Sequence, residues 1–205
     1  MAHNNAGIRG VKQACLLGLV FCLGLWHAQA RADAAEAQDP SAVAKLDRGG
    51  SFCITPGLLF PTGALAEAFN PAGDWNLDFD IGVSPAWSVI FGAGYADLED
   101  KTNQEARLLI VPAWFGFKSK AQFVPSVELY WSLAAELDYE KEYVRGQTGT
   151  GSLENLDGGA SAGAGFDLWL TKWLLAGVES RAHFIVEGSQ IYPLFELGLR
   201  LGLRG

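Results

Sequence analysis

The chain ends in a run that alternates strictly between apolar and polar positions. From Phe195 onward every second residue is Phe or Leu, and the residues between them are Glu, Gly or Arg. A period of two places the two sets on opposite faces of a β-strand, because successive side chains point to opposite sides of the pleat. The pattern predicts a strand over 191–204 with one apolar face and one face of glycine and charge.

The apolar residues elsewhere fall into pieces of about ten residues, the length at which a tilted strand crosses a bilayer. We predict eight strands, at 51–60, 74–83, 87–97, 107–118, 123–139, 158–170, 173–186 and 191–204. Glycine falls repeatedly on their polar face, as at Gly92, Gly163 and Gly165. Glycine weakens a strand and would bring no benefit on a face that meets water. Its recurrence on the polar face therefore indicates that this face lines a crowded barrel interior. The predicted arrangement has the apolar face toward lipid and the polar face toward the lumen.

The predicted connections alternate in length. Short connections are expected at 84–86, 119–122 and 171–172, and long ones at 61–73, 98–106 and 140–157, whereas 187–190 is short. Short turns at one end and longer loops at the other are typical of an up-and-down barrel in an outer membrane. The fold expected is all-β, an eight-stranded antiparallel up-and-down transmembrane β-barrel with both termini in the periplasm. Aromatic residues near strand ends fit an interfacial girdle: Phe60, Trp75, Trp87, Tyr95, Phe117 and Tyr139.

The N-terminal residues 1–32 have the features of a cleavable signal peptide. Arg9 and Lys12 precede an apolar core from Ala14 to Trp26, and small residues around Ala30 offer a cleavage site. That core is shorter than the roughly 20 residues that a transmembrane helix needs. Residues 33–50 are expected to form a flexible periplasmic lead-in, and residues 51–205 the outer-membrane β-barrel.

Cleavage changes the cysteine and charge composition. Two of the three cysteines leave with the signal, so Cys53 remains alone and an intrachain disulfide is excluded. Loss of Arg9, Lys12 and Arg31 takes the net charge from −8 to −11. Such an acidic chain is a poor candidate for binding nucleic acid, whose phosphates require basic side chains. No cofactor motif is present, and no Cys/His cluster offers a zinc site.

Charged residues recur on the face assigned to the lumen. An eight-stranded barrel is just wide enough for side chains to fill, so these groups are expected to pair as a charge network that plugs the interior. A narrow pore is the alternative. The candidate lumen residues are Asp78, Asp80, Glu128, Glu136, Asp167, Glu179, Arg181, His183, Glu196 and Arg200.

A second acidic group is expected at the outer mouth of the barrel. Carboxylates there could attract cations, or hold Ca²⁺ or Mg²⁺ that bridges to lipopolysaccharide, although a solvated rim is the simpler interpretation. The candidate rim residues are Asp97, Glu99, Asp100, Asp138, Glu140 and Glu142. Lys118, Lys172, Arg200 and Arg204 are expected at the periplasmic end.

An enzymatic role in lipid A modification would need a histidine beside a hydroxyl on the lipid-facing surface. His183 is the histidine that remains after cleavage, and it falls on the lumen face, whereas Ser180 points to the other side. The expectation is therefore a protein that is not an enzyme.

Three runs resemble the small outer-membrane β-barrel domain family, relatives in architecture of the outer membrane protein A, X and W groups. They are G-L-L-F-P-T-G at 57–63, F-N-P-A-G-D-W at 69–75 and G-A-G-Y at 92–95. The resemblance covers about 51–205 and implies a location in the cell outer membrane. It also implies contact with outer-membrane lipid, lipopolysaccharide and the barrel assembly machinery. Barrels of this kind usually end in an aromatic residue, whereas this chain ends in Leu203, Arg204 and Gly205.

The function expected from these patterns is that of a monomeric outer-membrane barrel with a structural, envelope or surface-interaction role. Two alternatives stay open: a narrow pore for small solutes or cations, and a soluble secreted lipocalin-like or β-sandwich binder. The last alternative would place the leucines of 195–203 at the centre and the arginines in water.

Overall fold

The computed structural model describes residues 49–103, 106–124, 126–146 and 149–204. The predicted signal peptide, and the lead-in as far as residue 48, lie outside the described residues.

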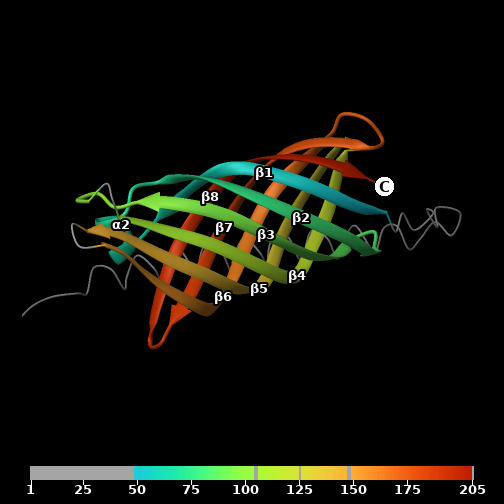
Figure 1. Cartoon of the computed structure of the whole chain (residues 1–205). Coiled ribbons are helices and arrows are strands. Elements are labelled where there is room, and N and C mark those ends of the chain that lie inside the picture. Colours follow the sequence, from blue (N-terminus) through green and yellow to red (C-terminus); the bar gives the residue numbers. More distant parts are fainter. Residues whose placement is uncertain (1–48, 104–105, 125, 147–148, 205) are drawn as a thin grey trace, which may run out of the picture. The chain divides into compact units, whose positions relative to one another are not determined.

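Eight antiparallel strands, each paired with its neighbour in sequence, form a closed barrel (Figure 1). The ring closes where β1 pairs with β8, from Ser51 opposite Arg204 to Pro61 opposite Leu194. The predicted all-β architecture, an eight-stranded antiparallel up-and-down barrel, is therefore confirmed. The strands are β1 Gly50–Pro61, β2 Ala72–Ser84, β3 Trp87–Glu99, β4 Ala106–Val124, β5 Val127–Gly146, β6 Gly149–Trp169, β7 Leu174–Glu187 and β8 Gln190–Arg204.

Two predicted connections are wrong. Most of the loop expected at 140–157 is strand, because β5 and β6 continue as a paired hairpin as far as Gly146 opposite Gly149. Charged residues on both faces suggested a loop. They are compatible with a strand where the hairpin extends beyond the lipid-facing part of the wall, because both of its faces can then meet water. The turn expected at 119–122 lies within β4, whose pairing with β5 extends to Val124 opposite Val127. The polar run suggested a turn, but the strand continues through it: Lys118 is buried inside the barrel, and Ser119 lies in the opposite register, paired with Trp87 and Trp131.

A short helix, α2 Ala64–Ala68, lies in the connection between β1 and β2. Backbone hydrogen bonds join this connection to the one between β3 and β4: the Asn70 amide donates to the Glu99 carbonyl (2.9 Å), and the Lys101 amide to the Ala68 carbonyl (2.8 Å). The end of the barrel that carries α2 is called the loop end here, and the opposite end, with the start of β1 and the end of β8, the turn end (Figure 1). Across the described residues, no helix has the length and apolarity to cross a membrane.

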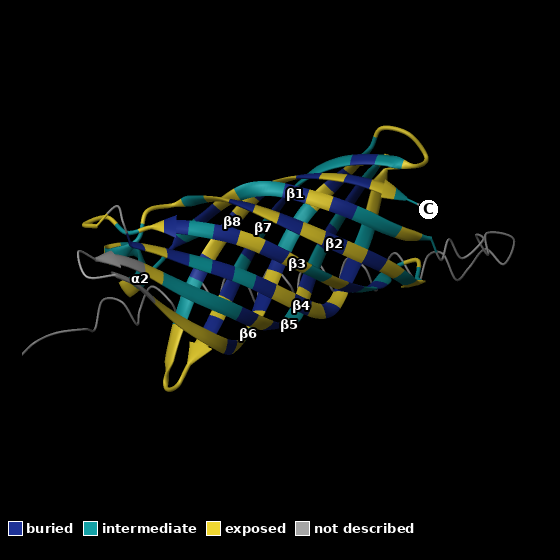
Figure 2. Ribbon diagram, in the orientation of Figure 1, coloured by how far each residue is buried: buried dark blue, intermediate teal, exposed yellow. Residues whose placement is uncertain are grey.

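The apolar face of each strand points outward and the polar face inward. Leu197, Leu199 and Leu201 are 47%, 63% and 54% exposed on the outside, whereas Arg200 is 2% exposed inside. The same alternation of buried and exposed residues runs around the wall (Figure 2). A soluble binder required the reverse arrangement, so that alternative is wrong.

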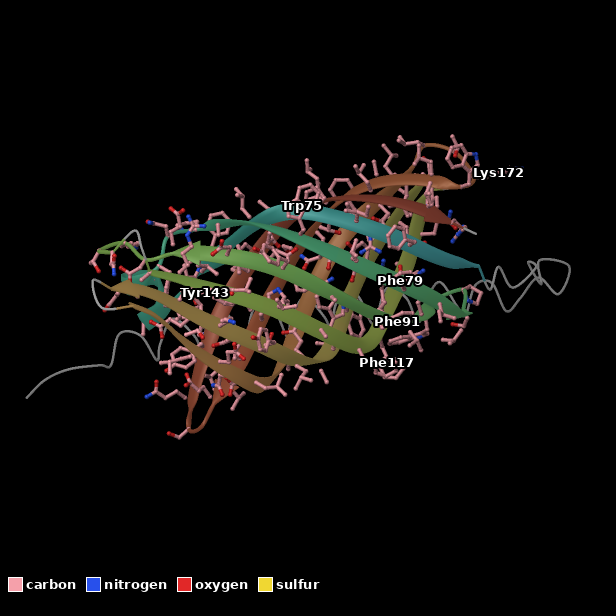
Figure 3. All side chains as sticks on the ribbon, in the orientation of Figure 1. Trp75, Phe79, Phe91, Phe117, Tyr143 and Lys172 are labelled. Carbon is pink, nitrogen blue, oxygen red and sulfur yellow. The ribbon has the colours of Figure 1, made fainter. Side chains whose placement is uncertain are left out.

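Aromatic side chains cover part of the outer surface. Trp75, Phe79, Phe91 and Phe117 project from the wall on neighbouring strands (Figure 3). The rings of Phe79 and Phe91 stack across β2 and β3 with centroids 5.1 Å apart. The outer face is thus a continuous apolar surface that includes stacked rings, an arrangement suited to hydrocarbon.

Glycines on the inner face make room for large side chains. A Cβ atom at Gly92 would lie 2.6 Å from the Trp114 ring, and one at Gly165 would lie 2.5 Å from the Tyr130 hydroxyl oxygen. Both distances are far below van der Waals contact. These glycines therefore allow the inward rings to pack against the wall, which explains why glycine shares the polar face.

We predict that Gly165→Ala destabilises the barrel by about 1–3 kcal/mol, the usual cost of overpacking a filled interior. Gly158→Ala is the matched control in the same strand, because a Cβ there meets no atom within 4 Å. That control should change stability by less than about 0.5 kcal/mol. Urea unfolding in lipid vesicles measures both, and equal stabilities of the two variants would contradict the packing argument.

Candidate functional site

The centre of the lumen holds a buried ion network built around Arg200 of β8. Its guanidinium lies 2.8 Å from Glu179 of β7, 3.2 Å from Asp80 of β2 and 3.4 Å from Asp167 of β6. One arginine therefore joins strands from opposite parts of the chain. A buried charge without partners would be costly, so this arrangement constrains the packing of the whole interior.

Two further cations complete the network. Lys118 of β4 lies 3.0 Å from Asp80 and 3.7 Å from Asp167, and its ammonium stacks 3.8 Å from the centre of the Tyr130 ring. Arg181 of β7 contacts Glu179 at 2.6 Å.

Aromatic rings also contribute hydrogen-bond donors to this network. The Trp114 indole donates to Asp78 at 3.0 Å, and the Tyr130 hydroxyl donates to Glu179 at 2.9 Å. Arg181 lies 3.1 Å from Asp78 and 4.3 Å from the centre of the Trp114 ring. Carboxylates, cations and rings thus fill the same narrow space.

A second chain of polar groups lies around His183. Its two ring nitrogens lie 3.0 Å from Glu136 and 3.1 Å from Glu196. The Asn76 amide donates to Glu196 at 2.7 Å and to Asp74 at 3.1 Å. These groups position one another across β2, β5, β7 and β8.

The ten lumen residues proposed from the sequence are all buried, none with more than 9% of its surface exposed. Glu128 lies apart from the central network, with Lys120 at 4.0 Å. The sequence analysis missed Lys118, Trp114 and Tyr130 as members of the network. Lys118 and Trp114 lie in the segment 107–118, which is apolar on both faces, so its alternation gave no sign of which side chains point inward. Tyr130 lies in 123–139, where only the carboxylates of the polar face were proposed.

The geometry around His183 offers no nucleophile. Both ring nitrogens are held by carboxylates inside the barrel, whereas Ser180 lies on the outward register and its hydroxyl donates to the Ala164 carbonyl. A histidine and a hydroxyl on opposite faces of one strand cannot exchange a proton directly.

An apolar layer covers the charged interior toward the loop end. It packs inward-facing residues of five strands against each other, and none is more than 8% exposed: Leu59, Ala96, Leu98, Leu108, Ile110, Ile185 and Leu194. Leu65 and Phe69, from α2 and the residue after it, pack on this layer. A cavity of about 20 Å³ lies against it, lined in part by Asp74, Asp138 and His183. That volume holds about one water molecule.

The six residues proposed as a cation-binding rim are not brought together. Asp97 and Glu99 both ion-pair with Arg107, at 3.1 Å and 3.3 Å. Asp138 is buried inside the barrel. Among the described residues, no group of three or more acidic, histidine or cysteine side chains has the arrangement of a metal site.

The remaining three rim residues line one hollow at the loop end, which we call the mouth cup. Its volume is about 540 Å³. Apolar side chains and carboxylates from several elements surround it: Leu65, Phe69, Leu108, Leu153, Tyr192, Asp100, Glu140, Glu142, Glu154 and Glu187. The Asp100 carboxylate accepts hydrogen bonds from the Thr102 hydroxyl and from the amides of Asn103 and Thr102, and these bonds lower its pKa.

The structure is similar to solved eight-stranded barrels of outer membranes. Ail, the attachment invasion locus protein of Yersinia pestis, crystallised with the heparin analogue sucrose octasulfate, matches with TM-score 0.56 and 15% identity over 77% of this chain and 99% of Ail. Neisserial surface protein A matches with TM-score 0.58 and 10% identity over 76% and 95%. OprG from Pseudomonas aeruginosa matches with TM-score 0.53 and 12% identity over 77% and 97%.

No protein family profile and no curated protein matches the sequence itself. At these low identities, the structural likeness establishes the fold alone. It confirms the architectural resemblance seen in the sequence, an eight-stranded barrel like those of outer-membrane proteins.

We predict that Arg200→Met lowers the free energy of unfolding by about 3–5 kcal/mol, because it leaves buried carboxylates without their shared cation. Lys141→Met is the control, since Lys141 pairs with Glu154 on the outer surface at 2.6 Å. Loss of such an exposed pair should cost less than about 1 kcal/mol. Denaturant titration of refolded protein compares the two. A cost for Arg200→Met no larger than that of the control would show that the network contributes little.

Proposed function

We propose that this protein is a monomeric outer-membrane β-barrel with a closed interior, and that it serves as an envelope component which presents its loop end to the cell surroundings. Both termini would then lie in the periplasm, since the start of β1 and the end of β8 share the turn end.

The observation that carries the proposal is the inverted wall. Leucines and aromatic rings cover the outside, while glycines, carboxylates and arginines lie within. A barrel in water would pay a large hydrophobic cost for such a surface, whereas in hydrocarbon the same surface is favourable. The first charged side chains on the outer face toward the loop end are those near Asp97, Arg107, Lys141 and Glu154, which fits the level of lipid headgroups.

The closed interior supports an envelope role over a transport role. The ion network fills the centre and the apolar layer covers it, so an ion entering the lumen would have to displace packed, paired side chains. The closed ring also has its strands paired around the full circumference, consistent with a monomer.

The surfaces available to partners lie at the loop end. They are the β1–β2 connection with α2 and the hairpin formed by β5 and β6, and they would contact lipopolysaccharide or other surface molecules. Insertion into the membrane would depend on the barrel assembly machinery.

We predict that Leu197→Arg, near the middle of the outer face of β8, costs about 2–4 kcal/mol in a bilayer. Leu156→Arg also replaces an outward leucine but lies near the loop end beside Glu154, so it should cost about 0–1 kcal/mol. Equilibrium folding into lipid vesicles measures both. Similar costs at the two heights would contradict the placement of the wall in a membrane.

We further predict that the refolded protein gives no steady conductance in planar bilayers, whereas a porin measured under the same conditions does. Stable, voltage-independent current steps from the wild-type barrel would favour the narrow pore instead and would overturn the proposed closed interior.

A further inference from the structure

The mouth cup combines two surfaces that differ in chemistry. Its floor consists of apolar side chains from α2, β4 and β8, among them Leu65, Leu108 and Tyr192. Five acidic residues line its walls, from the β3–β4 connection and from β5, β6 and β7, but the carboxylate of Glu154 turns to Lys141 on the outer surface, which leaves four. Among the described residues that line it, there is no lysine or arginine.

Not all of these carboxylates are available to a ligand. Glu154 is held by Lys141, and Asp100 by the turn that follows it. Among the residues whose side chains the structure describes, no lysine, arginine or histidine forms an ion pair with Glu140, Glu142 or Glu187. These three therefore present negative charge to the hollow without a cation to balance it.

Glu140 is the most affected of the three. Burial raises the pKa of its carboxyl to about 7, and repulsion by Asp157, Asp138 and Glu187 acts in the same direction. Its cross-strand partner on the neighbouring strand β4 is Ile110, which carries no charge. A cation bound in the cup would offset the negative charge of these carboxylates, and it would therefore favour the ionised form of Glu140.

We propose that the mouth cup binds a small amphipathic cation, that is, an ammonium or guanidinium group attached to an aromatic or aliphatic body. The volume of about 540 Å³ is that of a typical small-molecule site. The body would lie on the apolar floor and the charged group would contact Glu140 and Glu142. Charge complementarity and the apolar floor together select this class over bare metal ions and over anions.

This inference goes beyond the proposed envelope role and is tested separately from it, because binding at the mouth does not require a closed interior. The probe is tryptamine, titrated by calorimetry into the full barrel in nanodiscs of zwitterionic lipid, with empty nanodiscs subtracted. Tryptophol, indole-3-propionate and methylammonium are matched probes that lack the charge, reverse it, or lack the apolar body.

Tryptamine should bind saturably, and each matched probe should bind at least about tenfold more weakly, a difference of about 1.4 kcal/mol. Glu140→Gln should weaken tryptamine binding several-fold. Leu153→Asn should also weaken it, because it removes an apolar side chain from the wall of the cup. Glu67→Gln is the control, since it removes an equal charge from an exposed position of α2 outside the cup. Wild-type affinity should rise between pH 6 and pH 8 as Glu140 ionises, and Glu140→Gln should abolish that rise.

Three results would overturn the inference: equal binding of tryptophol or methylammonium, unchanged affinity in Glu140→Gln, or heats identical to those of empty nanodiscs. If a variant fails to fold, the wild-type comparison of the four probes decides the question alone. Salt supplies a second wild-type test, because screening at about 0.5 M should weaken tryptamine binding but leave tryptophol unaffected.

Discussion

The width of an eight-stranded barrel is the constraint on which this structure depends. Its interior is just wide enough to be filled by side chains, so every inward position must fit its neighbours and satisfy their polar groups. The chain meets much of this requirement with Arg200, Arg181 and Lys118 shared among buried carboxylates, and with glycines that admit Trp114 and Tyr130. The charged groups are used internally, so over the middle of the strands the outer face consists mainly of apolar side chains, with Ser180 of β7 as an outward hydroxyl.

The period-two pattern was sufficient to predict the fold and the direction of each face where one face is clearly polar. It worked for β2 and β8, and it identified the inward carboxylates because they alternate with leucine or phenylalanine. It failed for β4, where both faces are apolar and Lys118 lies near a polar run that resembles a turn. It also failed for the β5–β6 hairpin, since beyond the apolar wall both faces of a strand can be charged.

The apolar layer and the mouth cup could not be predicted from the sequence. Leu59, Leu98 and Ile185 come from strands far apart in the chain, and their contact depends on barrel register, which alternation leaves undetermined. Likewise Glu140 and Glu142 seemed to belong to one acidic rim with Asp97 and Glu99. Register instead turns the first pair into the cup and the second pair outward against Arg107. The apolar layer separates the filled interior of the barrel from the open mouth cup. The space into which a small molecule could fit therefore lies at the loop end.

The orientation of the wall is tested most directly by spin labels on its outer face. Single cysteines at positions 197, 199 and 201, in a Cys53→Ser background, would carry a nitroxide in the refolded barrel in lipid vesicles. We predict that oxygen, which concentrates in hydrocarbon, relaxes all three labels strongly, whereas a water-soluble nickel chelate does not, in contrast to a label at Glu67. Free access of the nickel chelate to the three positions, equal to that at Glu67, would contradict a lipid-facing wall.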